Sequence, residues 1–352
     1  MPKTLISLVS RQPMPNYIGY RVIQPDRMAY LFTRQEHQTL RNLQRVIRLP
    51  SLQYEVEAFD FLSVEGALQK LLADCEGDEI ILNITGGTKI MALAAFSVVR
   101  QVQGKIIYVN TDENSLVHLD SDRFQTEPLK NVVDVPTYLA LHGQNMIGSG
   151  KPLFPHLSYT IASQLRYLKR LLLDFRRLQS AVGYRILRKL TPSEVRFIKI
   201  LTNVDGFHWD SETSTIYCKN KQLIGYLAGN WLEEFVHQRL KKLKPDDLHL
   251  NVRISWELYQ KTFKNEFDVM MILRNRLYIF ECKSGNTSLD DINKLESLRA
   301  VVGGTYGKAY YVAASALPKS VKDRIVDFPG VALLEEKNLM KKNWLEEIFE
   351  DL

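Results

Sequence analysis

The sequence predicts an α/β protein with two domains joined by a basic, mainly helical connector. Apolar runs of strand length alternate with helical periodicity over residues 1–135, and a second set of such runs fills residues 221–352. Between them, residues 136–220 are rich in lysine and arginine. A chain of 352 residues is also longer than one ordinary hydrophobic core requires.

Composition and charge exclude several classes of protein. The chain is 45% hydrophobic and 24% charged, as in soluble globular proteins. It has no apolar run of about 18 residues and no signal-peptide pattern, so we expect a cytoplasmic protein without a membrane partner. Cys75, Cys218 and Cys282 are scattered, which indicates neither a disulfide framework nor a zinc ribbon. The net charge of +6 favours anionic partners.

The N-terminal domain alternates strands and helices along the chain. In order, we predict a strand over 4–10, a turn over 10–16, a strand over 28–32, a helix over 35–47, a short strand over 55–59, a helix over 64–75, a strand over 79–84, a helix over 90–102, a strand over 105–109 and a hairpin of 116–119 with 124–129. This alternation predicts a parallel, Rossmann-like sheet.

The turn after the strand over 79–84 is a candidate anion site. Its residues, Thr85-Gly86-Gly87-Thr88-Lys89, open the next helix, where backbone N–H groups and the helix dipole favour negative charge. The glycine spacing fits neither a Walker loop nor a dinucleotide fingerprint. Taken alone, such a turn is as often just a tight connection. Open α/β sheets bind ligands at the carboxyl ends of strands, and further residues follow strand ends here: Ser10, Arg11, Gln12, Pro13, Asn16 and Asn110.

The connector is strongly basic. Glycines and prolines over 143–155 mark a linker, and helices are predicted over 156–178 and from Thr191 to Leu201. Between His156 and Ile200, ten Lys and Arg residues stand against Asp174 and Glu194, a local charge of +8. Three interpretations stay open: a solvated structural bridge, a basic nucleic-acid surface and a winged-helix-like module.

The stretch from Asn265 to Gly285 has the clearest chemical pattern. Two apolar runs flank Arg274-Asn275, which predicts a tight hairpin of buried strands. In that register Asp268 lies opposite Glu281, and Lys283 shares their face. Two carboxylates held about 5 Å apart repel each other unless a cation lies between them, and oxygen ligands suit Mg²⁺ or Mn²⁺. The alternative is a salt-bridged strand end.

This arrangement resembles the PD-(D/E)xK nuclease signature: Asp268, twelve intervening residues, then Glu281-Cys282-Lys283, with Phe267 in place of the usual proline. The resemblance implies that Asp268, Glu281 and Cys282 bind Mg²⁺ or Mn²⁺. It also implies that Lys283 orients the attacking water or stabilises the transition state. The implied fold is restriction-endonuclease-like, αβββαβ, with elements over 222–243, 248–256, the hairpin, 288–302 and 308–314.

A further acid is expected in the helix over 222–243. The match Gly-x-x-Leu-Glu over 229–233 resembles the family's helix and points to Glu233 as a catalytic acid that supports the metal. Glu234 is the second choice. The alternative is that both are ordinary helix acids that face solvent.

The N-terminal motifs resemble a second family. Ser10-Arg11-Gln12-Pro13-x-x-Asn16 and the turn from Thr85 to Lys89 resemble the CARF domain, the sensor of cyclic oligoadenylates in type III CRISPR defence. A CARF domain followed by a PD-(D/E)xK domain is similar to the family of cyclic-tetra-adenylate-activated nucleases that cut single-stranded DNA and RNA. The resemblance implies that the strand-end residues named above, Asn110 included, bind a cyclic oligoadenylate.

The expected function is a metal-dependent endonuclease, an antiviral ancillary effector of CRISPR defence that acts as a homodimer. Its activator would span the two-fold axis and would favour one arrangement of the subunits, with the connector placed to transmit the change. Single-stranded substrates fit better than duplex because no helix-turn-helix reading element is evident. Two alternatives stay open: a catalytically silent regulator that senses cyclic nucleotides and binds nucleic acid, and an N-terminal domain that degrades its own activator.

Overall fold

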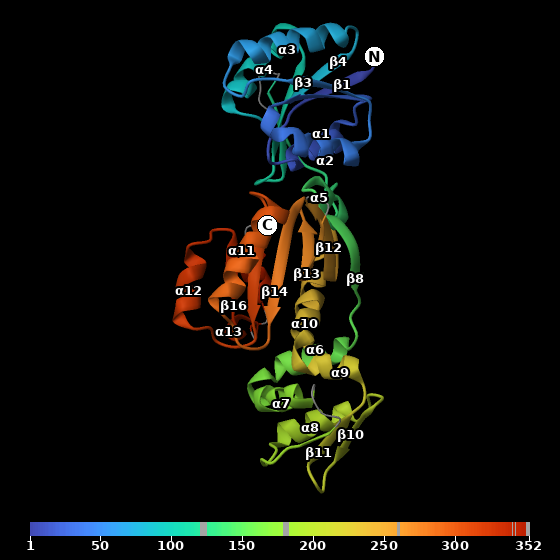
Figure 1. Ribbon diagram of the computed structural model, residues 1–352, viewed down its shortest axis with the longest axis vertical. Helices are drawn as coiled ribbons and strands as arrows, with labels where there is room; N and C mark the ends of the chain where they lie inside the picture. Colours follow the sequence, from blue (N-terminus) through green and yellow to red (C-terminus); the bar gives the residue numbers. More distant parts are fainter. Residues whose placement is uncertain (120–124, 179–182, 259–260, 340, 342, 350–352) are drawn as a thin grey trace.

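The computed structural model describes residues 1–119, 125–178, 183–258, 261–339, 341 and 343–349. Three units follow one another along the longest axis: the N-terminal α/β domain, the C-terminal α/β domain and a smaller module (Figure 1). The module comprises residues 155–218 and is called the distal module below. Among the described helices, none is long and apolar enough to cross a membrane.

The N-terminal domain is built on a seven-stranded sheet in the order β3-β2-β1-β4-β5-β6-β7. The strands are β1 (Lys3–Leu8), β2 (Arg27–Phe32), β3 (Ser51–Glu55), β4 (Glu79–Asn83), β5 (Lys105–Asn110), β6 (Ser115–His118) and β7 (Gln125–Pro128). Strands β1 to β5 are parallel, whereas β6 and β7 are antiparallel. The predicted parallel sheet and closing hairpin are confirmed, although Phe124 of that hairpin lies outside the described residues.

Helices cover both faces of this sheet. One face carries α1 (Met14–Ile23) and α2 (His37–Ile47), and the other carries α3 (Phe61–Asp74) and α4 (Lys89–Gln101). Two predictions are wrong here. The segment after Gln12 is a helix rather than a turn, because Pro13 and Pro15 occupy the start of α1, where no backbone N–H is needed. The third strand ends at Glu55, since Asp60 caps α3 through the N–H groups of Leu62 and Ser63.

The C-terminal domain has a six-stranded sheet in the order β16-β15-β14-β13-β12-β8. Its strands are β8 (Asn145–Gly150), β12 (Asp247–Leu258), β13 (Lys261–Leu273), β14 (Arg276–Lys283), β15 (Lys308–Ala313) and β16 (Val331–Leu334), and its helices are α10 (Trp231–Leu240), α11 (Leu289–Gly303), α12 (Lys319–Val326), α13 (Glu336–Leu339) and α14 (Trp344–Phe349). The order α10-β12-β13-β14-α11-β15 confirms the predicted αβββαβ fold. The predicted helix over 222–243 is divided into α9 (Lys221–Gly225), a π-helical turn over Tyr226–Asn230 and α10.

The glycine-rich stretch predicted as a linker is partly a strand. β8 pairs antiparallel with β12 at the edge of the C-terminal sheet. A Cβ on Gly148 would lie 2.8 Å from the Arg253 guanidinium, and one on Gly150 would lie 3.1 Å from Asn251 Cβ. The stretch is therefore a paired edge strand, in which Gly150 packs closely against Asn251.

The distal module combines helices with a small sheet. It contains α6 (Pro155–Ser163), α7 (Leu165–Arg177), β9 (Gly183–Arg185), α8 (Pro192–Leu201), β10 (Phe207–Asp210) and β11 (Thr215–Cys218), with the antiparallel order β10-β11-β9. The single helix predicted over 156–178 is therefore two helices that meet at Gln164. The module lies beyond the C-terminal domain, at the end remote from the N-terminal domain (Figure 1). The prediction of a bridge between the two domains is wrong.

The two α/β domains touch directly at the turn of the β13–β14 hairpin. The buried Asn275 side chain donates hydrogen bonds to Asn114 Oδ1 (2.9 Å) and to Lys130 O (3.0 Å). Its Oδ1 accepts one from Val132 N (2.8 Å). The side-chain amide therefore donates two hydrogen bonds to the N-terminal domain and accepts one from it, which fixes the turn against that domain.

Further contacts hold the same end of the C-terminal sheet. Arg276 Nη2 lies 2.6 Å from Asp112 Oδ1, just beyond β5. In α5 (Val135–Leu141), the Tyr138 hydroxyl donates to Gly303 O at the end of α11 (2.8 Å). The N-terminal domain thus grips β13, β14 and α11 without the distal module taking part.

Candidate active site and ligand cradle

The β13–β14 hairpin places Asp268 and Glu281 at one strand end. Its ladder pairs Val269 with Phe280 around a two-residue turn at Arg274-Asn275. Both turn residues have positive φ, 51° and 60°, as this kind of hairpin turn requires. The predicted hairpin register is confirmed from the turn to the pair of Val269 and Phe280, and Asp268 and Glu281 are the next residues beyond that pair.

Glu233, Asp268 and Glu281 form what we call the carboxylate cluster. Burial raises the pKa of each of the three acids. Mutual repulsion raises the pKa further, because Asp268 acts on both Glu233 and Glu281. None of the three forms an ion pair with any residue that the structure describes. The ammonium groups of Lys283 and Lys294 lower the pKa of Asp268 and Glu281, but burial and repulsion outweigh them.

Glu233 reaches the cluster from a different layer of the fold. Trp231 and Leu232, its neighbours at the start of α10, pack in the core on the Phe280 face of the sheet, whereas Glu281 alternates to the other face. Strand β13 changes face at Asp268, because Phe267 packs in the core on the Ile279 face and Val269 packs in the core on the Phe280 face. The π-helical turn before α10 precedes this point, and such turns often occur at functional sites.

Glu234, the second choice in this helix, has a structural role. It is buried, and its carboxylate accepts hydrogen bonds from Leu153 N and from Phe154 N (3.1 Å). Burial raises the pKa of Glu234, while these two backbone bonds act in the opposite direction. The carboxylate thereby anchors the chain ahead of α6, and Glu233 is the acid of this pair that faces the cluster.

Lys283 lies beside the cluster but pairs elsewhere. Its Nζ is 3.2 Å from Asp291 Oδ1 in the first turn of α11. Asp291 is itself oriented by Ser288, which caps α11 and donates its N–H to Asp291 Oδ2 (2.9 Å). Lys283 still lowers the pKa of Asp268, so its ammonium acts on the cluster without neutralising it. The sequence did not identify this ion pair between Asp291 and Lys283.

Glu266 is a second residue that sequence reasoning missed. It lies two positions before Asp268 on β13. Its charge raises the pKa of both Glu233 and Asp268. A second acid only two positions from Asp268 was the signal that could have identified it.

Cys282 contributes through its backbone. Its N–H donates to Asp268 Oδ2 at 2.6 Å and fixes that carboxylate. Burial, followed by the charges of the neighbouring acids, raises the pKa of the Cys282 thiol well above its usual value, so the thiol stays protonated. Of the predicted metal ligands, the Cys282 side chain therefore fits a hard cation least, and only its carbonyl oxygen suits one.

The donor set of the carboxylate cluster fits a divalent cation such as Mg²⁺ or Mn²⁺. Hard cations prefer carboxylate oxygens, and a cation would relieve the repulsion that raises the three pKa values. Within the described residues, however, no three His, Cys, Asp or Glu side chains are gathered into a ready metal site. The acids thus have the right chemistry and lie near one another, but they are not drawn together around one point.

The glycine-rich turn forms a cradle at the carboxyl edge of the N-terminal sheet. A Cβ on Gly86 would lie 2.0 Å from Leu8 O, so only glycine lets this turn approach the end of β1. Gly87 has a φ of 73°, in the region that favours glycine. Thr88 caps α4 by accepting from Met91 N (3.2 Å) and donates to Ala58 O (2.5 Å). Lys89 is exposed at the first position of α4.

Asn83, at the end of β4, organises this cradle and was not identified from the sequence. It is fully buried, and its side chain donates to Pro15 O (3.0 Å) in α1. Its Oδ1 accepts from both Thr85 N (3.1 Å) and Thr85 Oγ1 (2.7 Å). Thr85 Oγ1 in turn accepts from Val109 N (2.7 Å) in β5. An Asn at the end of an apolar strand was the available signal.

The other predicted ligand residues lie on the strand ends next to this turn, because β1, β4 and β5 are neighbours. Ser10 Oγ accepts from Gln12 N (3.4 Å), and Arg11 is exposed, 3.7 Å from Glu36. Asn110 Oδ1 accepts from Asp112 N (3.2 Å) and starts the turn into β6.

Gln12 and Asn16 differ from the exposed members of this set. Gln12 Nε2 donates to Thr305 Oγ1 (2.9 Å) of the C-terminal domain. Asn16 is fully buried in α1 and donates to Leu8 O (3.1 Å), while Pro13 is buried at the cap of that helix. Gln12 Oε1 and Asn16 Oδ1 are buried acceptors without a donor among the described residues.

Two protein families match the regions that carry these two sites. The family described as the Card1 CARF domain matches residues 4–138, and the Card1-like endonuclease domain matches residues 220–349. Together the matches span both α/β domains. The chain belongs to the Card1-like family. The resemblance inferred from the sequence motifs is thereby confirmed at the level of the family.

Solved structures resemble this Card1-like chain over its whole length. Protein VC1899 from Vibrio cholerae has a TM-score of 0.88 at 20% identity, covering 99% of this chain and 98% of that one. Can2 from Sulfobacillus thermosulfidooxidans in complex with cyclic tetra-adenylate has a TM-score of 0.82 at 21% identity, covering 98% and 96%. At these identities the likeness establishes the shared fold. No curated protein matches the chain by sequence.

A more distant structure has a related architecture. It is described as a type III CRISPR defence DNA nuclease activated by cyclic oligoadenylate, and it has a TM-score of 0.55 at 17% identity. The match covers 95% of this Card1-like chain but only 48% of that one.

Proposed function

We propose that the chain is a metal-dependent endonuclease that cleaves single-stranded DNA or RNA. The carboxylate cluster is the observation that carries the proposal: three largely buried acids that form no direct ion pair with a described residue and lie next to the ammonium of Lys283. In an inert salt-bridged strand end these acids would be paired, whereas here the ion pair of Lys283 goes to Asp291. Hydrolysis of a phosphodiester needs positive charge near the phosphoryl oxygens and an activated water.

Each residue of the site has a distinct part in this proposal. Asp268 and Glu281, with Glu233 in support, would hold the cation, and the Cys282 N–H keeps Asp268 oriented. A divalent cation, when bound, supplies Lewis acidity toward the phosphodiester and acidifies water. Lys283, held by Asp291, would place a positive charge against the scissile phosphate or orient the attacking water.

We also propose that cyclic tetra-adenylate binds the cradle and activates the nuclease. The Can2 structure contains that ligand in a protein of the same fold. Here the exposed Lys89 and the N-terminus of α4 suit phosphates, and the unpaired acceptors Gln12 Oε1 and Asn16 Oδ1 suit the amino groups of adenine. As in the distant defence nuclease, the setting would be antiviral type III CRISPR defence.

A homodimer would place two cradles on one symmetric activator. Phe59, Leu62 and Leu93 expose 82%, 73% and 61% of their surface. These side chains lie near the cradle, since Thr88 bonds to Ala58 and Leu93 is in the second turn of α4. Exposed apolar residues grouped beside a ligand site favour a subunit contact there.

The hairpin turn offers a direct route from cradle to active site. Asp112 follows the cradle residue Asn110 and pairs with Arg276, while Gln12 bonds to Thr305 beyond α11. A structural change at the cradle would therefore be transmitted to β14, which carries Glu281, and to α11, which carries Asp291. A ligand shifts activity only by its preference for one arrangement of these contacts.

Cleavage assays test the enzyme against the silent regulator. The full chain is incubated with labelled single-stranded DNA and RNA, with Mn²⁺ and cyclic tetra-adenylate added together, singly or not at all. We expect cleavage only when both are present, and its loss when a chelator removes the metal. If the activator binds but no cleavage occurs under any of these conditions, the protein is a silent regulator and not an enzyme. Cyclic tetra-adenylate recovered intact would exclude degradation of the activator.

A further inference from the structure

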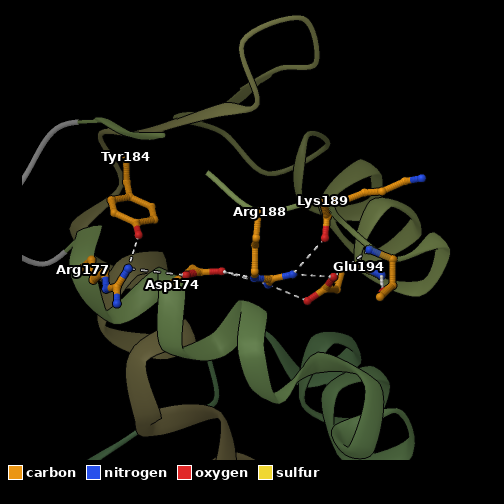
Figure 2. A network of polar contacts seen from close by, with 7 residues as sticks. Asp174, Arg177, Tyr184, Arg188, Lys189 and Glu194 are labelled. Carbon is orange, nitrogen blue, oxygen red and sulfur yellow. Dashed lines mark hydrogen bonds and ion pairs between the residues drawn. The ribbon is translucent and has the colours of Figure 1, made fainter. Parts of the chain in front are cut away.

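The positive charge of residues 156–200 is not used by the proposed site. Ten basic residues stand there against Asp174 and Glu194. In the structure both acids are buried, at 8% and 1% exposure, and both bind the guanidinium of Arg188. Figure 2 shows this guanidinium between the two carboxylates. The acids of the segment are thus turned inward, so every exposed charge of its described residues is positive.

Helix α7 carries part of this charge on one exposed stripe. Arg166, Arg170, Leu173 and Arg177 follow one another at spacings of four, three and four residues, which is one face of a helix. Tyr167 is 60% exposed beside the first two. Neither Arg166, Tyr167 nor Arg170 has a side-chain hydrogen bond or ion pair with the rest of the described chain. A tyrosine between unpaired arginines is therefore presented to solvent.

The stripe is fixed next to the proposed active site. Arg176 donates to Ser284 O (2.6 Å) and to Ala228 O (3.0 Å), so it ties α7 to the residue after Lys283 and to the turn before α10. A groove of about 160 Å³ lies between α7 and the segment from Ser284 to Asn286. Lys169 and Leu173 of α7 line it, and Leu173 also belongs to the exposed stripe. In Figure 1 the arrowhead of β14 points toward this end of the molecule.

We propose that Arg166, Arg170 and Leu173 of the stripe, together with the adjacent Tyr167, form the track along which single-stranded nucleic acid reaches the carboxylate cluster. This deepens the proposed function and rests on it. The arginines contact phosphates, the tyrosine stacks on a base, and the groove leads the strand past Ser284 to Lys283. A single strand is the occupant because only unpaired bases offer a face to an exposed ring.

Binding measurements with matched variants test the track. The full chain with cyclic tetra-adenylate and a chelator is titrated with a labelled oligothymidine, and fluorescence anisotropy is followed over a range of salt. The variant Arg166→Ala/Arg170→Ala should lower the slope of log affinity against log salt by about 1.4, since each phosphate contact on a single strand contributes about 0.7. The control Arg196→Ala/Lys199→Ala removes two exposed charges from α8 and should leave the slope unchanged.

Tyr167 separates stacking from charge. Tyr167→Ala should weaken binding by about 5- to 150-fold, the range measured for loss of one stacked base, whereas Tyr167→Phe should bind like the unmodified protein. With metal present, Tyr167→Ala should raise KM and leave kcat unchanged. Thermal unfolding of each variant confirms that these surface changes leave the fold intact.

The outcomes distinguish the track from the proposed activity. Equal loss of slope in the α7 and α8 variants, equal binding by Tyr167→Ala and Tyr167→Phe, or tighter binding of duplex would overturn the track. So would the absence of any binding by the unmodified protein. If binding depends on the α7 residues but no cleavage occurs, the track is supported and the proposed nuclease activity is rejected. Cleavage with unaltered binding by the α7 variants would support the nuclease and remove the track.

Discussion

The carboxylate cluster and the cradle both lie at strand ends, yet they are stabilised in opposite ways. In the cradle, Asn83, Thr85 and Thr88 satisfy one another and the backbone, so the turn is held in shape without a ligand. In the cluster, burial and mutual repulsion raise the pKa of every acid, and no described residue forms an ion pair with them. The cradle is thus preorganised for its ligand, whereas the cluster is destabilised until positive charge arrives.

The difference also assigns different tolerances to the two sites. A cradle made of backbone and close packing fails when volume is added, since its shape is its function. The carboxylate cluster should lose activity when one of its charges is removed, although the fold should not be destabilised, because a repulsion between buried carboxylates is lost. Four changes probe this contrast, beginning with the largest effect.

Removing one charge from the cluster should abolish cleavage. Asp268→Asn keeps the shape and the hydrogen bond from Cys282 N but weakens cation binding, so we expect activity to fall by about 10³-fold or more. Affinity for cyclic tetra-adenylate, measured by calorimetry, should stay unchanged. The free energy of unfolding should be equal or higher, because a buried repulsion is lost. Metal-dependent cleavage at the original rate by this variant would show that the site is wrongly assigned.

Adding one methyl group to the cradle should weaken activator binding. In Gly86→Ala the new Cβ would meet Leu8 O at 2.0 Å, and the turn must move away from β1. We expect affinity for the activator to fall about 10- to 100-fold, as for an overpacked core. Gly66→Ala is the control, because nothing lies within 4 Å of its new Cβ in the middle of α3. That change should stabilise the fold by about 0.5–1 kcal/mol with unaltered binding; equal losses in both variants would refute the close-approach argument.

Removing the contact that Asn275 makes between the two domains should uncouple activator binding from cleavage. Asn275→Gly keeps the positive φ of the turn but removes three hydrogen bonds to the N-terminal domain. We expect the ratio of activated to basal cleavage to fall about 10-fold, within the usual range of coupling energies, while activator affinity changes little. Arg274→Gly is the matched control, with φ of 51° and no side-chain hydrogen bond to a described residue. Full activation of Asn275→Gly would show that the signal takes another route.

The smallest expected effect is a pH dependence of the stability, which comes from Asp247 and His249 near the contact between the two domains. Burial opposes ionisation of Asp247, but hydrogen bonds from His249 and from Val135 N keep the pKa of Asp247 below its usual value. The bond to Asp247 raises the pKa of His249. The carboxylate's contribution is lost as pH falls through its lowered pKa, and the imidazolium's is lost as pH rises through its raised pKa.

The pair should therefore stabilise the fold most between about pH 4 and pH 6.5, by up to about 1 kcal/mol. In His249→Gln, unfolding followed by denaturant titration should lose this contribution at pH 5.5 and differ less from the unmodified protein at pH 9. An unchanged difference at both pH values would assign the interaction to uncharged packing.

The sequence by itself determined the parts that depend on local order. Alternation of apolar residues and the Arg274-Asn275 turn were enough to set the hairpin register, because side chains on a strand alternate strictly and a two-residue turn leaves one pairing. The motifs around Gly86 and Glu281 were enough for the family. Two segments were predicted wrongly because proline and glycine also mark loops. The start of α1 contains prolines and was predicted as a turn, and the edge strand β8 contains glycines and was predicted as part of a linker.

Only the tertiary structure decided what meets across layers. Glu233, on a helix that packs against the Phe280 face of the sheet, lies near Asp268, and Asp291 in the first turn of α11 forms the ion pair with Lys283. The basic segment between the domains in sequence lies beyond them in space, because β8 carries the chain along the full edge of the C-terminal sheet before α6 begins. Such contacts follow from how whole elements pack, and residues far apart in the chain carry no periodic signal of them.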